Sequence, residues 1–179
     1  MSSFDRAFEI LIGHEGGFTD DPRDAGNWTG GAPGQGALRG TRWGISAAAY
    51  PHLDIATLTL AEARAIYRRD YWDQVLGEAL PPPVALLAFD AAVNCGVRTA
   101  IRWLQAAVGA TPDGIAGPRT RMAAAQACAT QDGRERVATE MLARRNLHNA
   151  ALRNWGDFGL GWSRRLFALP FQAMRMEEA

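Results

Sequence analysis

The spacing of apolar residues predicts that most of this chain is helical. From Ser3, five apolar residues follow the i, i+3, i+4, i+7, i+8 pattern of an amphipathic helix: Phe4, Ala7, Phe8, Leu11 and Ile12. The same stripe passes through Glu15, so the pattern predicts that Glu15 closes the helix with its carboxyl group toward the packed side. Gly16 and Gly17 then release the backbone.

The polar segment 16–46 breaks this periodicity. It is rich in Gly, Asp, Asn, Thr and Pro, which favours short extended pieces joined by turns, and residues 30–36 read as a flexible Gly-rich insertion. The helical period returns at Thr59, where Thr59-Leu60-Ala61-Glu62 matches a capping box.

The second half is predicted to be helical as well. Helices are expected over Val84–Cys95, over Arg98–Val108, from Pro118 onward and from Asp132 to about Asn154, with a Gly/Trp-rich turn at 155–162 before a last short helix. The 84–95 helix is apolar nearly all round and is therefore expected to be buried. Only Asp90 and Asn94 interrupt it, on one face, where they either bond to neighbouring backbone or line a polar cleft.

These elements predict a mainly α protein with a small irregular or β segment near its N-terminus. Its 179 residues, 47% of them hydrophobic, suffice for one ordinary domain or two small ones. The sequence shows no transmembrane helix or secretory signal, and Cys95 and Cys128 lack the spacing of a disulfide framework or metal site, so neither a cofactor nor a metal is expected. Net charge is zero, but residues 1–95 carry −5 and residues 96–165 carry +6, a basic half suited to an anionic polymer or surface.

Two carboxyl groups suggest acid–base chemistry. Apolar surroundings raise the pKa of a glutamic acid such as Glu15 and keep it protonated as a general acid. Asp24 lies in a polar turn, and two carboxyls in such different environments fit glycoside hydrolysis. An Asx-turn explains Asp24 as well, and Asp20 and Asp21 compete for the same role.

Three further side chains near these carboxyls are candidates for the site. The hydroxyl of Thr41 either orients a water or simply suits a strand. Trp28 and Trp43 lie in the same polar segment, where indole rings can stack on sugars.

Several motifs, in order, resemble glycoside hydrolase family 108, whose members are often encoded by phages. They are Glu15-Gly16-Gly17-Phe18, Asp21-Pro22-Arg23-Asp24, Thr41-Arg42-Trp43-Gly44-Ile45-Ser46, Ile66-Tyr67-Arg68-Arg69-Asp70-Tyr71-Trp72 and Phe89-Asp90-Ala91-Ala92-Val93-Asn94-Cys95-Gly96. The resemblance implies a lysozyme-like catalytic domain over residues 1–96. It also implies an N-acetylmuramidase that cuts the β-1,4 bond after N-acetylmuramic acid, with Glu15 as the catalytic acid. By analogy with phage-type lysozymes, Asp24 positions water or stabilises the cation and Thr41 assists.

Residues 97–175 resemble the predicted peptidoglycan-binding domain that follows the catalytic part in this family. This match is carried by Leu104-Gln105-Ala106-Ala107-Val108-Gly109, Asp113-Gly114-Ile115-Ala116-Gly117-Pro118-Arg119-Thr120 and Gly161-Trp162-Ser163-Arg164-Arg165. We interpret these motifs as structural rather than as sugar contacts. The expected partner is the glycan strand of peptidoglycan, with Asp90 and Asn94 as further substrate-binding candidates. Neither nucleic acid nor stable membrane insertion is expected.

The sequence leaves three alternative functions open, and it also bears on where the protein acts. A lytic transglycosylase also needs one buried glutamate, and a non-catalytic wall-binding or structural protein is a further alternative; an arginine-rich nucleic-acid binder lacks a recognisable module. Without a signal sequence, the protein is expected to be made in the cytoplasm and to reach the wall after release, through a phage holin pore or another export route.

Overall fold

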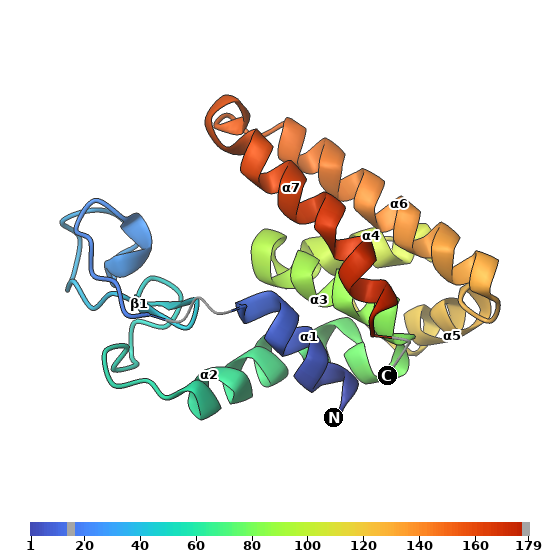
Figure 1. Cartoon of the computed structure of the whole chain (residues 1–179), viewed down its shortest axis with the longest axis horizontal. Helices are drawn as coiled ribbons and strands as arrows, with labels where there is room; N and C mark the ends of the chain where they lie inside the picture. The colour runs from blue at the N-terminus through green and yellow to red at the C-terminus, as the bar shows by residue number, and fades with distance from the viewer. Residues whose placement is uncertain (14–16, 177–179) are drawn as a thin grey trace. The chain divides into compact units, whose positions relative to one another are not determined.

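The computed structural model describes residues 1–13 and 17–176 (Figure 1). Helices dominate it, which confirms the mainly α prediction. The α-helices are α1 (Ser3–Ile12), α2 (Leu60–Tyr67), α3 (Pro82–Cys95), α4 (Val97–Ala107), α5 (Pro118–Ala127), α6 (Gln131–Ala150) and α7 (Trp155–Met174). The shorter helical turns are η1 (Ala25–Asn27), η2 (Arg68–Trp72), η3 (Asp73–Val75) and η4 (Gly77–Ala79).

The chain divides into two compact units. Residues 8–67 form one, which we call the loop-rich unit, and residues 1–7 together with 68–179 form the other, the helical unit. Helix α1 therefore contributes residues to both. Within the described residues, no helix is long and apolar enough to cross a membrane.

Helix α1 ends earlier than the apolar stripe predicts. Gly13 has a left-handed backbone (φ 59°) and its N–H donates to the carbonyl of Glu9 at 2.9 Å, so the helix stops at Ile12. The prediction of a helix closed by Glu15 is wrong for this reason. Glu15 itself lies outside the described residues, and the stripe on α1 gives no argument for the direction of its carboxyl group.

The extended pieces predicted for the polar segment are present in the loop-rich unit. Strands β1 (Thr41–Arg42) and β2 (Ile45–Ser46) pair antiparallel, and isolated bridges join Thr19 to Thr41 and Trp28 to Leu38. The Trp28–Leu38 bridge joins the two ends of the Gly-rich insertion, which therefore forms a separate loop. Residues before and after the insertion are thereby brought together.

The capping box predicted at α2 is confirmed. The Thr59 hydroxyl accepts from the backbone N–H of Glu62 at 3.2 Å, and Glu62 Oε2 accepts from the backbone N–H of Thr59 at 2.8 Å. Two of the N–H groups that a helix N-terminus leaves unpaired are thereby satisfied, which fixes where the helix begins.

Helix α3 is the centre of the helical unit. It contacts α4, α6 and α7, and its residues 84–92 are buried, as its apolar sequence predicts. Phe4 packs against Trp72 and Phe89 with ring centroids 5.6 and 6.0 Å away, and Trp72 and Phe89 meet edge to face. This cluster ties residues 1–7 to the rest of the unit.

The end of the chain differs from the prediction. The segment 155–162 is the first part of α7, a helix of 20 residues that runs antiparallel beside α6 (Figure 1), not a turn before a short helix. Gly159 serves packing there, because a Cβ on it would lie 2.8 Å from the ring of Trp155. Close approach of an aromatic ring, rather than a turn, thus explains a glycine at this position.

Candidate active site

The predicted catalytic residues belong to the loop-rich unit. Glu15 lies outside the described residues. Thr19, the fourth residue after it in the sequence, forms an antiparallel bridge with Thr41. The Thr19 N–H donates to the Thr41 carbonyl at 3.0 Å and the reverse bond measures 2.8 Å. The segment that follows Glu15-Gly16-Gly17 is therefore aligned with β1.

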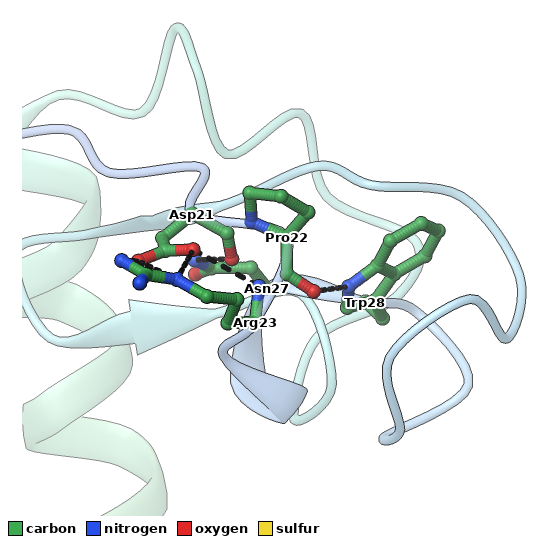
Figure 2. A network of polar contacts seen from close by, with 5 residues as sticks. All are labelled: Asp21, Pro22, Arg23, Asn27 and Trp28. Carbon is green, nitrogen blue, oxygen red and sulfur yellow. Dashed lines mark hydrogen bonds and ion pairs between the residues drawn. The ribbon is translucent and has the colours of Figure 1, made fainter.

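Asn27 organises this part of the unit. Its side chain is 0% exposed; its Nδ2 donates to the carbonyl of Asp21 at 3.0 Å and its Oδ1 accepts from the Thr41 hydroxyl at 2.7 Å. Its carbonyl accepts the N–H groups of Arg39 and Gly40. Figure 2 shows Asn27 beneath the Asp21–Arg23 turn, with its amide directed at the backbone. A buried amide with both ends paired fixes loops that have little apolar core.

Thr41 is held by Asn27 in a defined orientation. Because its hydroxyl hydrogen is donated to Asn27 Oδ1, the hydroxyl oxygen is left as an acceptor. The sixteen residues between Asp24 and Thr41 do not separate the two segments, since the Trp28–Leu38 bridge closes most of that stretch on itself.

Asp24 is exposed and caps η1. Its Oδ1 accepts from the backbone N–H of Gly26 at 2.8 Å, and its carbonyl accepts from the N–H of Asn27 at 3.2 Å. This is the Asx-turn role that the sequence left open. A carboxylate has further acceptor sites, so the cap fixes its direction while leaving capacity for a water.

Asp21 is occupied by an arginine. Arg23 binds it in a bidentate manner, with Nε to Oδ1 at 3.0 Å and Nη2 to Oδ2 at 2.7 Å, as Figure 2 shows. Hydrogen bonds from the Arg23 side chain and backbone lower the pKa of the Asp21 carboxyl. An ionised, arginine-bound carboxylate is a weaker base than a carboxylate without such a partner.

The two candidate sugar-stacking tryptophans are partly exposed and fixed by their indole N–H groups. Trp28 donates to the carbonyl of Pro22 at 2.9 Å (Figure 2), and Trp43 donates to the carbonyl of Leu58 at 3.1 Å. Trp43 also has a left-handed backbone (φ 53°), and the Tyr67 hydroxyl donates to its carbonyl at 3.2 Å. A non-glycine residue in this conformation persists only where its surroundings hold it.

A hollow of about 380 Å³ opens beside these loops. It is lined by Phe18, Leu38, Arg39, Asp54 and Ala56. Phe18 is the third residue after Glu15 in the sequence and is 43% exposed. The hollow therefore combines apolar surface with one cation and one carboxylate.

Asp90 and Asn94 lie in the helical unit, on α3. The Asp90 carboxylate is 1% exposed and receives hydrogen bonds from Arg145 and from Arg165, whose Nη2 lies 2.6 Å from Oδ1. Asn94 Nδ2 donates to the carbonyl of Asp90 at 2.7 Å. Of the two possibilities left open by the sequence, Asn94 fits backbone bonding, and Asp90 has a third role, as the buried acceptor of two arginines.

The Leu104-Gln105 and Asp113-Gly114-Ile115 motifs are joined by a polar network. Gln105 is buried, and its Nε2 donates to Asp113 Oδ1 at 2.7 Å while its Oε1 accepts from the N–H of Gly114 at 2.8 Å. The contacts agree with the structural interpretation of these motifs.

One residue of the site was missed by sequence reasoning. The sequence marks Asn27 only as part of a polar segment, although Gly26-Asn27-Trp28 places an amide between a glycine and a large aromatic. That order is a weak signal because the partners of Asn27 include Thr41, fourteen residues away.

Among the described residues, no group of three or more His, Cys, Asp or Glu side chains is arranged to hold a metal ion.

Comparison with known proteins assigns both parts of the chain. Residues 8–96 match the family model for glycosyl hydrolase 108, and residues 99–167 match that for a predicted peptidoglycan domain. The solved structure of Brucella abortus SagA is similar over 99% of this chain and 97% of its own, with a TM-score of 0.79 and 28% identity. A comparison with curated proteins gave no match. The chain thus consists of a glycosyl hydrolase 108 segment, which makes it a glycoside hydrolase, followed by a predicted peptidoglycan domain.

Proposed function

We propose that this protein is an N-acetylmuramidase, which hydrolyses the β-1,4 bond between N-acetylmuramic acid and N-acetylglucosamine in peptidoglycan. The observation that carries the proposal is the succession of a glycosyl hydrolase 108 segment and a peptidoglycan domain in one chain. The first segment indicates cleavage of a glycosidic bond, and the second indicates that the polymer is peptidoglycan.

Glu15 is the proposed general acid. It donates a proton to the glycosidic oxygen, the bond to the anomeric carbon breaks, and positive charge builds on that carbon as in an oxocarbenium ion. This assignment comes from the position of Glu15 in the Glu-Gly-Gly-aromatic motif. The hollow beside Phe18, three residues further along, supports a saccharide site close to the motif in the sequence.

Thr41 and Asp24 are proposed to position the attacking water. The Thr41 oxygen, with its hydrogen committed to Asn27, accepts a hydrogen bond from the water. Asp24, held by its cap on η1, accepts the proton that the water loses as it attacks. Asp21 is less suited to this role because Arg23 lowers its pKa.

The products released from purified sacculi test the reaction. Mass spectrometry should find fragments that end in reducing N-acetylmuramic acid. Ends of 1,6-anhydro-muramic acid would instead identify a lytic transglycosylase, in which no water enters and Asp24 has no hydrolytic role. Binding to sacculi without any release of fragments would identify a non-catalytic wall-binding protein.

Substitution of Glu15 tests its role. Glu15→Gln removes the proton that the acid supplies, and we expect the cleavage rate to fall by about 10²–10⁴-fold. The matched control is Glu9→Gln, the same change at an exposed position of α1. Equal activity of Glu15→Gln and the control would remove Glu15 from the mechanism.

The assisting carboxylate is tested in the same assay. Asp24→Asn should slow hydrolysis more than Asp20→Asn or Asp21→Asn, since Asp24 is the proposed proton acceptor and the other two changes remove the same charge at neighbouring positions. A larger effect of either neighbour would transfer the role to it.

Because peptidoglycan is outside the cytoplasmic membrane, we also propose that the protein acts at the cell wall after release through a holin or another export route.

A further inference from the structure

Three aromatic side chains form a continuous surface at the start of α7. Trp155, Phe158 and Trp162 follow the i, i+3, i+7 spacing that places them on one side of the helix. Phe158 and Trp162 are stacked, with ring centroids 6.0 Å apart and planes inclined by 24°, and Trp155 lies 6.2 Å from Trp162. We call these three residues the α7 aromatic platform.

The platform rests on the helix backbone and is partly open to solvent. The ring of Trp155 rests against Gly159, where a Cβ would come within 2.8 Å of it. Phe158 is 55% exposed, and both tryptophans are partly exposed. In Figure 1 the start of α7 and the end of α6 extend beyond α3, and all three platform residues belong to the first half of α7.

The indole N–H groups of the platform differ from those of three other tryptophans. Trp28, Trp43 and Trp72 each donate to a protein oxygen, at 2.9, 3.1 and 3.1 Å. Within the described part of the chain, neither Trp155 nor Trp162 has such an acceptor. The platform therefore offers flat apolar faces together with two uncommitted donors.

We propose that the α7 aromatic platform binds the amino-sugar rings of the glycan strand, as a contact of the peptidoglycan domain separate from the proposed active site. The C–H groups on one face of a pyranose are complementary to the electron-rich face of an aromatic ring. The carbonyl of an N-acetyl group accepts a hydrogen bond from an indole N–H. This proposal rests on the proposed function for the identity of the polymer.

Binding to intact sacculi tests the proposal. The full chain carrying Glu15→Gln, which leaves the polymer uncut, is sedimented with purified sacculi, and the bound fraction is measured against sacculus concentration. Adding Phe158→Ala and Trp162→Ala should weaken binding about tenfold or more, since stacking and burial at two rings are lost together. The matched control is Phe171→Ala, an aromatic residue of α7 that is 68% exposed and outside the platform.

Equal binding by the platform variant and the control would overturn the proposal, and so would a change in oligomeric state that accounts for the loss of binding. Should the double variant fail to fold, the single change Phe158→Ala decides, because this ring is largely in solvent. In addition, soluble N-acetylglucosamine–N-acetylmuramic acid oligosaccharides should quench tryptophan fluorescence less in Trp162→Phe than in the parent chain. Equal quenching would contradict direct contact.

The outcome is distinguishable from failure of the proposed function. A chain that binds sacculi through the platform but releases no fragments would leave this proposal standing and remove the enzymatic one. A chain that releases muramic acid ends while the platform variant binds normally would do the reverse.

Discussion

At the scale of single residues, the candidate active site depends on polar side chains that the protein itself holds in place. Asn27 has no exposed surface and joins the Asp21 carbonyl to the Thr41 hydroxyl. Asp24 is fixed by its cap on Gly26. Orientation in this unit therefore comes from hydrogen bonds rather than from apolar packing around the site.

Replacing Asn27 tests this dependence. Asn27→Ala leaves the Thr41 hydroxyl and the Asp21 carbonyl without their partner, and we expect a loss of about 1–3 kcal/mol in the free energy of unfolding. Denaturant titration measures it. The control is Gln35→Ala, an exposed side chain in the same loops. A loss no greater than that of the control would contradict the role given to Asn27.

At the scale of elements, the β1–β2 hairpin turns through two residues with left-handed backbones. Trp43 and Gly44 have φ values of 53° and 73°, which is the pattern of a two-residue type I′ turn. Tyr67, at the end of α2, lies against this turn, because a Cβ on Gly44 would collide with its hydroxyl. The hairpin is thereby fixed to α2 within the loop-rich unit.

The turn can be tested with two glycines of similar backbone. Gly44→Ala and Gly34→Ala both place a side chain at positive φ, at a cost of about 1–2 kcal/mol each. Gly34 has open space around it, so Gly44→Ala should destabilise the protein more, as measured by thermal or denaturant unfolding. The excess should shrink in a Tyr67→Phe background. Equal effects in both backgrounds would show that the Tyr67 hydroxyl does not limit the turn.

The capping box of α2 makes a pH-dependent contribution to stability. Hydrogen bonds from the backbone and hydroxyl of Thr59 lower the pKa of Glu62 in the folded protein. A carboxyl whose pKa is lower folded than unfolded stabilises the fold above its unfolded value, about 4.3, and this contribution is lost as the pH falls through the folded value.

Comparison of wild type with Glu62→Gln across pH tests this contribution. We expect the denaturation midpoint of the variant to be lower at neutral pH and to approach that of wild type at pH about 3, below the usual pKa of glutamate. Glu9→Gln, at an exposed helical position, provides the control. A difference that stays constant with pH would assign the effect to something other than the charge of Glu62.

At the scale of the whole molecule, ion pairs to the buried carboxylate of Asp90 join the two segments that the family models recognise. Asp90, at the end of the hydrolase segment, binds Arg145 and Arg165 of the peptidoglycan domain inside the helical unit. The boundary between the two families near residue 97 therefore falls within one compact unit. The two segments share a core there.

Removing Asp90 should weaken this unit strongly. Asp90→Ala leaves Arg145, whose side chain is 6% exposed, as a buried charge without its partner, and we expect a loss of about 3–5 kcal/mol in the free energy of unfolding. Arg165→Ala should cost less because that side chain is partly exposed. A similar, small effect of both changes in denaturant titration would show that the pair is not a main support of the unit.

The sequence by itself determined those features that depend on near neighbours. The capping box at Thr59, the burial of the apolar helix 84–95 and the extended pieces of the polar segment follow from spacing and composition, and the ordered motifs identified the family. Local hydrogen bonds and periodic patterns depend on residues that are close together in the sequence, so they can be predicted without knowledge of the tertiary structure.

The tertiary structure decided what depends on distant partners. Asn27 is paired with Thr41, fourteen residues away in the sequence, and Asp90 is paired with Arg165, 75 residues away. The Gly/Trp-rich segment is the first part of α7, a helix that packs against α3 and α6. Burial and pairing of this kind arise only when separate segments meet, which is why periodicity along the chain did not reveal them.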